Sequence, residues 1–247
     1  MSQMDNLSEE KNDNEKKLAE SVSYALDLMK RALENVSTEY VHLEISDEEL
    51  QKNDLPGDVR KQVERCFAYE LYHQLRTIFI KEKPETTIKI NAEVPKKVIG
   101  KEKIETKYPD IVIHGGQGDN NTNNQLLIAE IKRNLGSINK NNVKEDLQKL
   151  RQYIKELCYV STQNTFQSGC FIMTNIDHNS LVKEVEEIVR KDKDFRDTMS
   201  DVKSIITIFS YEIEIKDNKK VPNIESITHD QIMSGIENNH MHNSPSD

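Results

Sequence analysis

The sequence predicts an α/β fold in which helices flank a mixed β-sheet. Two observations support this class. Short runs rich in isoleucine and valine alternate with longer segments whose apolar residues recur at steps of three and four. The predicted core order is αβββαβαβ, and no internal repeat is visible. A chain of 247 residues suits one such domain with helical additions, since domains usually span about 100 to 200 residues.

The first part of the chain is expected to be helical after a polar start. Residues 1–14 are polar and acidic and are expected to form a disordered tail, followed by an N-terminal helical extension over 15–57. Apolar residues recur at helical spacing from Leu18, which predicts an amphipathic first helix. A short extended piece, "EYVHLEI", and a brief helix beginning at "SDEE", a capping-box pattern, should follow.

The main domain is expected over residues 58–228, with a C-terminal tail over 229–247. Its first helix should run from about Val59 to Ile80. The spacing of apolar residues predicts the later elements. Three strands at 86–98, 109–115 and 124–133 come first, followed by a helix at 141–157, a strand at 169–176, a helix at 180–195 and a closing strand at 204–215.

Charge and cysteine content exclude several classes of protein. The net charge of -9 argues against a protein that coats DNA indiscriminately. Lysines still cluster at 96–107, and basic residues recur over 132–155, where either phosphate contact or a solvated surface would account for them. The three widely spaced cysteines suggest reduced core residues. Because no leader or long apolar run is present, we expect a soluble, cytoplasmic protein without a membrane partner.

Two carboxylates and a lysine fall inside the strand-like runs. Side chains alternate along a strand, so Glu130 and Lys132 should share one face. If the strands at 109–115 and 124–133 pair as a hairpin, Asp110 would lie across from them. Converging carboxylates repel each other unless a cation lies between them, and oxygen ligands suit Mg²⁺ or Mn²⁺. A neighbouring lysine could orient or deprotonate a water and stabilise a phosphate.

These residues resemble the signature of a known family. "PD" at 109–110 followed by "EIK" at 130–132 is similar to the motif of PD-(D/E)XK nucleases, whose restriction-endonuclease-like core is αβββαβ. The resemblance covers about residues 58–180. It implies that Asp110 and Glu130 bind Mg²⁺, that the Ile131 carbonyl is a further ligand and that Lys132 serves the attacking water.

The family often adds a glutamate from the helix that precedes the strands. Glu70 is the first choice here, because a helical wheel places it in the sector of Val63, Phe67 and Leu71, where an unpaired carboxylate would be costly. It would bind a second ion or the lysine. Glu93 is the weaker choice. One-metal and two-metal chemistry both stay open.

Simpler interpretations exist for each of these residues. Asp110 could begin a strand after a proline turn, and Glu130 with Lys132 could be an exposed ion pair. His73 and His114 are more often structural residues, although a substrate role for His114 is considered. Four polar residues on the following helix could support the site as in the family or could simply be solvated: Asp146, Gln148, Lys149 and Tyr153.

The expected function is that of a Mg²⁺- or Mn²⁺-dependent endonuclease that hydrolyses DNA, of restriction, defence or repair type. Its partner would be nucleic acid, most naturally DNA, and a homodimer is an assembly the sequence allows. Basic residues at 96–107 and on the helix after the motif would contact backbone phosphates. The rival hypothesis is a non-catalytic interaction or scaffold protein with the same fold, and a third is an unrelated enzyme with chance motif residues.

Overall fold

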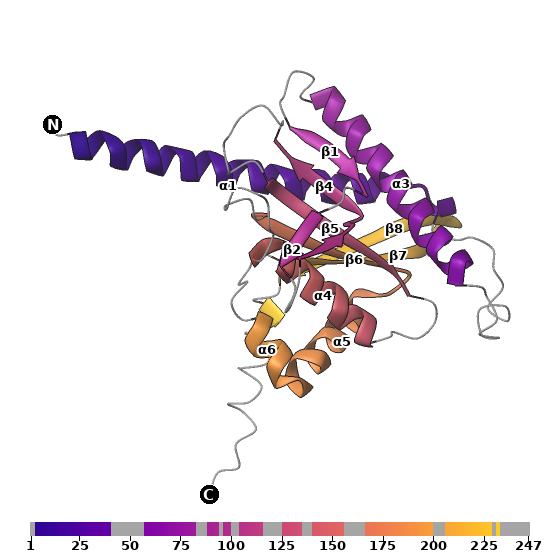
Figure 1. Ribbon diagram of the computed structural model, residues 1–247. Helices are drawn as coiled ribbons and strands as arrows, with labels where there is room; N and C mark the ends of the chain where they lie inside the picture. The colour runs from indigo at the N-terminus through magenta and orange to yellow at the C-terminus, as the bar shows by residue number, and fades with distance from the viewer. Residues whose placement is uncertain are drawn as a thin grey trace, which may run out of the picture.

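A six-stranded mixed sheet occupies the centre of the computed structural model, and helices cover both of its faces (Figure 1). The structure describes residues 3–40, 57–82, 88–93, 96–99, 104–115, 125–134, 140–155, 166–199, 206–228 and 231–232. The helices are α1 (Gln3–Asn35), the 3₁₀ turn η1 (Thr38–Tyr40), α3 (Gly57–Glu82), α4 (Lys140–Lys155), α5 (His178–Lys191) and α6 (Lys193–Met199). Within these ranges, none of the helices has the length and apolar character that crossing a bilayer requires.

The strands of the central sheet lie in the order β1-β4-β5-β6-β7-β8. They are β1 (Lys89–Ala92), β4 (Ile111–His114), β5 (Gln125–Arg133), β6 (Ser168–Thr174), β7 (Ile206–Lys216) and β8 (Lys219–Thr228). The first three pair antiparallel, β6 and β7 run parallel to β5, and β8 returns antiparallel at the far edge. A mixed α/β fold, as the sequence predicts, is therefore present.

The two faces of the sheet bury different helices because strand residues alternate. Ile111, Ile113 and Ile131 pack on one side with α1 and α3, which contribute buried residues such as Leu28 and Leu71. On the other side, apolar strand residues meet α4, α5 and α6 through the following buried residues: Val112, Ile128, Phe171, Leu147, Leu150, Val185 and Phe195. Glu130 shares the strand face of Ile128, so its side chain is directed towards α4.

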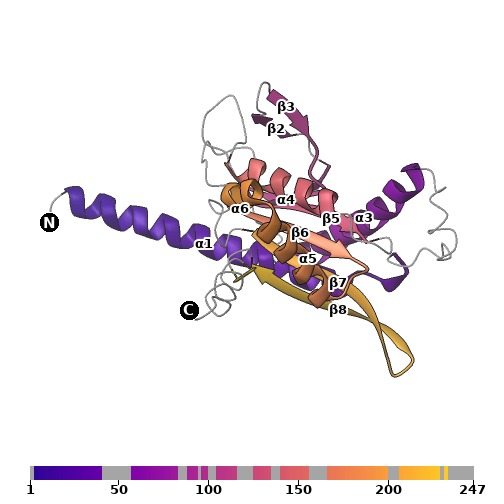
Figure 2. The same ribbon diagram turned by 90° about the horizontal axis from the view of Figure 1, so that it is seen from below.

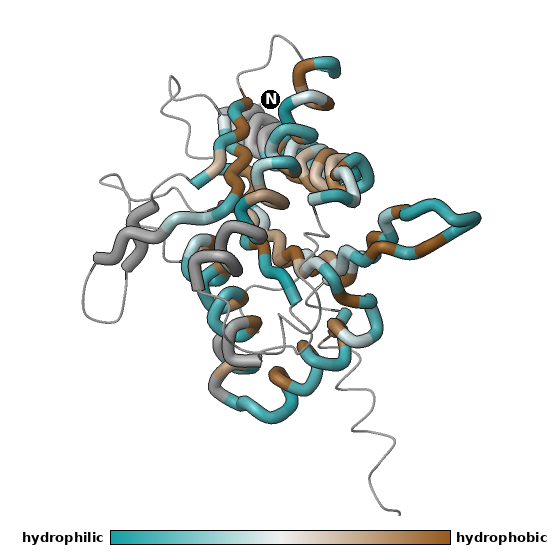
Figure 3. The backbone as a smooth tube through the Cα atoms, turned by 90° about the vertical axis from the view of Figure 1, so that its right-hand side faces the viewer, coloured by the Kyte–Doolittle hydropathy of each residue, from teal (hydrophilic) through white to brown (hydrophobic). Residues whose placement is uncertain are grey.

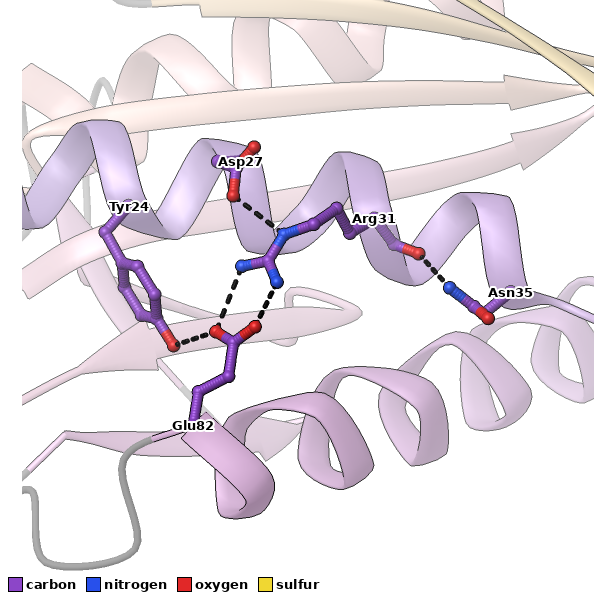
Figure 4. A network of polar contacts seen from close by, with 5 residues as sticks. All are labelled: Tyr24, Asp27, Arg31, Asn35 and Glu82. Atoms are coloured by element: carbon purple, nitrogen blue, oxygen red, sulfur yellow. Dashed lines mark hydrogen bonds and ion pairs between the residues drawn. The ribbon is translucent and has the colours of Figure 1, made fainter.

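Polar contacts join α1 to the end of α3. The Arg31 guanidinium makes two hydrogen bonds to the Glu82 carboxylate and a third to Asp27, 2.7 Å away, and Tyr24 donates to Glu82 as well (Figure 4). On the apolar side of α1, Ala25, Leu28 and Met29 are fully buried. The C-terminal half of α1 therefore belongs to the core of the domain, although the sequence pattern assigns it to an extension.

Three elements differ from the sequence expectation. The predicted strand at 86–98 is two strands, because β1 ends at Ala92 and a separate hairpin of β2 (Lys96–Ile99) and β3 (Ile104–Lys107) follows. This hairpin extends from the body beside α4, where a basic loop is expected (Figure 2). The helix α1 begins at Gln3, so most of the expected tail at 1–14 is helical.

The third difference is an additional edge strand, β8. Asp217 and Asn218 both have positive φ, 53° and 60°, which forms a two-residue turn that returns the chain from β7. Pro222 interrupts the apolar alternation, and an edge strand tolerates it because a proline there removes no interior hydrogen bond. Hydrophilic residues predominate at the outer end of this hairpin (Figure 3).

Several expectations fall on residues that the structure does not describe. The extended piece at 39–45 is described only at its first two residues, which belong to η1, and the brief helix from Ser46 lies outside the described residues. Cys158 and all but two residues of the expected C-terminal tail lie outside them as well. Of the other cysteines, Cys170 is buried as expected for a core residue, whereas Cys66 is exposed.

Candidate active site

The structure brings Asp110 beside the strand that carries Glu130 and Lys132. The antiparallel register places Ile111 opposite Ala129, and the backbone amide of Ile131 donates a 2.7 Å hydrogen bond to Asp110 Oδ2. Asp110 therefore lies at the entrance of β4 against the C-terminal half of β5. Burial raises the pKa of Glu130, and the Asp110 carboxylate raises it further, as expected for two nearby like charges.

Glu130 is the most deeply buried charged group of this cluster. Its side chain is 4% exposed, and Lys149 Nζ lies 2.5 Å from its Oε2 atom. Its Oε1 atom is buried without a hydrogen-bond partner. The fully buried Tyr153 lies one helical turn after Lys149, and burial together with the Glu130 carboxylate raises the pKa of its hydroxyl. Lys149 and Tyr153 therefore both line the Glu130 carboxylate from α4.

Lys132 lies between two further carboxylates. Its Nζ atom is 3.5 Å from Asp146 Oδ2 on α4 and 3.8 Å from Glu64 Oε2 on α3. Glu64 also accepts a 3.5 Å hydrogen bond from the backbone amide of Arg133. The lysine is thus held at the point where α3, α4 and the end of β5 meet.

Burial controls the electrostatics of the carboxylates. Desolvation raises the pKa of Glu130 to about 8 and that of Asp110 to about 6, and the hydrogen bond from Ile131 and the nearby lysines only partly offset it for Asp110. The pKa values of Glu64 and Asp146 are also raised, mainly by burial. Four carboxyl groups with raised pKa values therefore surround two lysines.

The lysine at the motif position stays charged. Burial acts to lower the pKa of Lys132, but the carboxylates of Asp146, Glu64 and Asp110 outweigh this effect and the pKa is raised. An ammonium with a raised pKa orients water and stabilises negative charge, and it does not accept a proton at neutral pH. Of the two roles open from the sequence, orienting a water and deprotonating it, this environment favours the first.

Glu70 does not join this cluster. It lies six positions after Glu64, a rotation of roughly 240° about the helix axis, and its carboxylate accepts a 2.7 Å hydrogen bond from Gln74 on the same helix. Glu93 is exposed, has a positive φ of 50° and lies 3.3 Å from the Arg65 guanidinium. The carboxylate that α3 brings to the motif lysine is therefore Glu64.

The two histidines have other surroundings. The ring of His114 is buried and makes a 2.7 Å contact with Asn91 through Nε2 and another with the Gly115 carbonyl through Nδ1. A neutral ring that donates from Nδ1 and accepts at Nε2 satisfies both contacts. His73 is exposed on α3. The two contacts of His114 fit its structural interpretation.

One member of the cluster, Glu64, was not singled out by the sequence argument. Glu64 was missed, although Phe67 and Ala68, one turn later on α3, are buried and show which face turns inward. Lys149, which the sequence left open as a supporting group of the site, a phosphate contact or a solvated residue, pairs with Glu130. Asp146 and Tyr153 join the cluster as supporting groups, while Gln148 is half-buried on the same helix.

The carboxylate oxygens of the cluster are the type of ligand that a hard divalent cation prefers. Asp110 and Glu130 offer buried carboxylate oxygens, and Glu130 Oε1 has no hydrogen-bond partner. Among the described residues, no three His, Cys, Asp or Glu side chains stand in a ready metal-binding arrangement. The Lys149 ammonium is the cation that faces Glu130.

Comparisons with known proteins give little similarity. No protein-family model matches the chain, and no curated protein matches it. The central domain of yeast acetyl-CoA carboxylase is a distant structural neighbour, with a TM-score of 0.28 and 11% sequence identity over 87% of this chain. The chain spans 34% of that carboxylase chain. A likeness at this level carries no conclusion about fold or function.

Proposed function

We propose that the protein is a metal-dependent nuclease of the PD-(D/E)XK type that hydrolyses phosphodiester bonds of DNA. The single observation that carries the proposal is the convergence of Asp110 and Glu130 with Lys132 next to them, through the Ile131 amide and the β4–β5 register. The order α3, β1, β4, β5, α4, β6, with β6 parallel to β5, supports it because the family core is αβββαβ.

In this proposal Asp110 and Glu130 hold a Mg²⁺ or Mn²⁺ ion, with the Ile131 carbonyl as a further ligand. When bound, such an ion polarises a phosphate and lowers the pKa of a water. Lys132, fixed between Asp146 and Glu64, orients the attacking water and stabilises charge on the scissile phosphate. Of the two roles that the sequence argument gives to Glu70, binding a second ion or the lysine, Glu64 takes the second.

The β2–β3 hairpin is the proposed contact to backbone phosphates. Its register pairs Lys96 with Lys107, and Lys97 lies next to this pair, so these lysines lie at the end of the hairpin where the chain enters and leaves it. The hairpin lies next to α4 (Figure 2). Lys144 and Lys149 on α4 are less suited to this task, because ion pairs with Asp192 and Glu130 hold them. Binding through such lysines would weaken steeply as salt rises.

A nicking assay tests the proposal. Supercoiled plasmid is incubated with the purified chain in Mg²⁺ or Mn²⁺, beside the variants Lys132→Ala and Lys144→Ala. We expect the wild type and Lys144→Ala to nick the plasmid. Lys132→Ala should nick it at least about 100-fold more slowly, because removing one group that stabilises charge in the transition state usually costs a factor of this size. Equal nicking by both variants would refute the role of Lys132.

One observation favours the rival function of a non-catalytic interaction protein. The Lys149–Glu130 ion pair satisfies an oxygen that a metal would need, as expected if a former site had become structural. In that case the chain would neither cut plasmid nor bind Mn²⁺ through Asp110. Titration calorimetry of the wild type and Asp110→Asn separates the two functions, because only the nuclease proposal expects binding that the variant loses.

A further inference from the structure

The Lys149 ammonium contacts one of the two carboxylates that a divalent ion would use. Its Nζ atom lies 2.5 Å from Glu130 Oε2, and the Lys149 side chain is 25% exposed, whereas that of Glu130 is 4% exposed. The lysine therefore reaches Glu130 from the more open side of the cluster. Its positive end lies where a cation bound to this carboxylate would also lie.

Several features set this contact apart from an ordinary structural ion pair. Glu130 Oε1 is buried without a hydrogen-bond partner, so Lys149 satisfies only part of the carboxylate. The Asp110 carboxylate repels Glu130 and is itself bound by the Ile131 amide. Lys132 pairs with Asp146 and Glu64, and the lysine that pairs with Glu130 is Lys149. An incompletely satisfied pair of buried carboxylates still attracts a second, stronger cation.

We propose that Lys149 is a tethered counter-cation that a divalent metal must displace from Glu130, and that it thereby sets the metal affinity of the site. The inference rests on the proposed function, because it takes Asp110 and Glu130 as the metal-binding carboxylates. The lysine limits the repulsion between the carboxylates in the metal-free protein. The same contact weakens metal binding, since the ammonium and the metal compete for one oxygen.

Helix α4 supplies a matched control for this proposal. Lys144 lies on the same helix, pairs with Asp192 and has a side chain that is 32% exposed, close to the value for Lys149. Its ion pair does not involve the cluster. Substituting either lysine by methionine removes one positive charge and one ion pair and keeps most of the side-chain volume.

Mn²⁺ binding by titration calorimetry at pH 8.5 is the test. We expect Lys149→Met to bind Mn²⁺ at least about fivefold more tightly than the wild type. This factor is the low end of the range by which two coupled ligands usually change each other's affinity. Lys149→Arg, which keeps the cation, should stay near the wild type, and Lys144→Met should not change the affinity. Where Lys149→Met does not fold, Lys149→Gln removes the charge and keeps a hydrogen-bond donor to Glu130.

Two results would overturn the inference in distinguishable ways. Equal or weaker Mn²⁺ binding by the charge-removing variants, with binding that Asp110→Asn abolishes, would refute the role of Lys149 and leave the metal site in place. Absence of Asp110-dependent Mn²⁺ binding in the wild type and in every Lys149 variant would refute the metal site itself, and the proposed function would fail with it.

Discussion

Lys132 on β5 lies 3.8 Å from the carboxylate of Glu64 on α3, measured from Nζ to Oε2. Glu64 also accepts a hydrogen bond from the Arg133 amide, so it ties α3 to the end of the strand that carries Glu130 and Lys132. This carboxylate connects the helix to the site, and Glu70, on another side of the same helix, pairs with Gln74.

The Glu64 contact gives the first prediction. Glu64→Gln removes the charge that holds Lys132 and should reduce plasmid nicking by about 10-fold or more, because a small displacement of a positioned group is costly in catalysis. Glu70→Gln is the matched control on the same helix and should keep wild-type nicking. A loss in Glu70→Gln with normal activity in Glu64→Gln would instead support the choice made from the helical wheel.

The hydrogen bond from Ile131 to Asp110 gives the second prediction. Asp110→Asn keeps an oxygen acceptor for the amide and removes a buried charge whose pKa is raised to about 6. Above that pH the variant should therefore unfold at the same or a higher denaturant concentration than the wild type, while losing Mn²⁺ binding and nicking. Urea unfolding at pH 8 measures the stability, and a large loss there would show that Asp110 is a structural residue.

The raised pKa of Glu130 predicts how stability depends on pH. The carboxyl has an ordinary pKa of 4.5 and a folded-state value of about 8, so between these values the folded chain binds more protons than the unfolded chain. The contribution of Glu130 to the free energy of unfolding of the metal-free protein should therefore be greatest below pH 4.5. This contribution should fall as the pH rises from 4.5 to about 8. At about 1.4 kcal/mol per pH unit the fall is at most about 5 kcal/mol.

Glu130→Gln provides the control for this pH effect. Because the amide does not titrate, the unfolding free energy of the variant should vary less between pH 5 and pH 8 than that of the wild type, a range taken from the pKa values of Glu130. Urea melts at several pH values in EDTA give both curves. Parallel curves would show that Glu130 does not carry the dependence.

Much of the fold could be predicted from local patterns, and the failures have physical causes. The helix with Leu147 and Leu150 has strong periodicity because it buries one face against the core. The strand with Glu130 is a nearly continuous apolar run because both of its faces are buried. The strand β8 was missed because an edge strand is half-exposed and Pro222 weakens its pattern. The break between β1 and β2 was missed because both pieces are rich in β-forming residues, and pairing partners decide where a strand ends.

The site residues on the strands could be predicted from the sequence, whereas those on the helices could be predicted less well. Alternation along β5 requires Glu130 and Lys132 to share a face, so only the pairing with β4 was needed to add Asp110. The rotation of α3 relative to the sheet is a tertiary property that a helical wheel cannot give. The helical wheel favoured Glu70, whereas the packing of Phe67 and Leu71 against the sheet brings Glu64 to Lys132.

The burial of α1 gives the last prediction. Leu28 is fully buried on the sheet face covered by α1 and α3, although it lies in a segment that the sequence assigns to an extension. Leu28→Ala should lower the free energy of unfolding by about 2 to 5 kcal/mol, the cost of a cavity in a packed core. Glu34→Ala, at an exposed position on the same helix, should change it by less than about 0.5 kcal/mol. Urea unfolding at pH 7 compares the two variants, and similar small losses in both would mean that α1 packs on the domain only loosely.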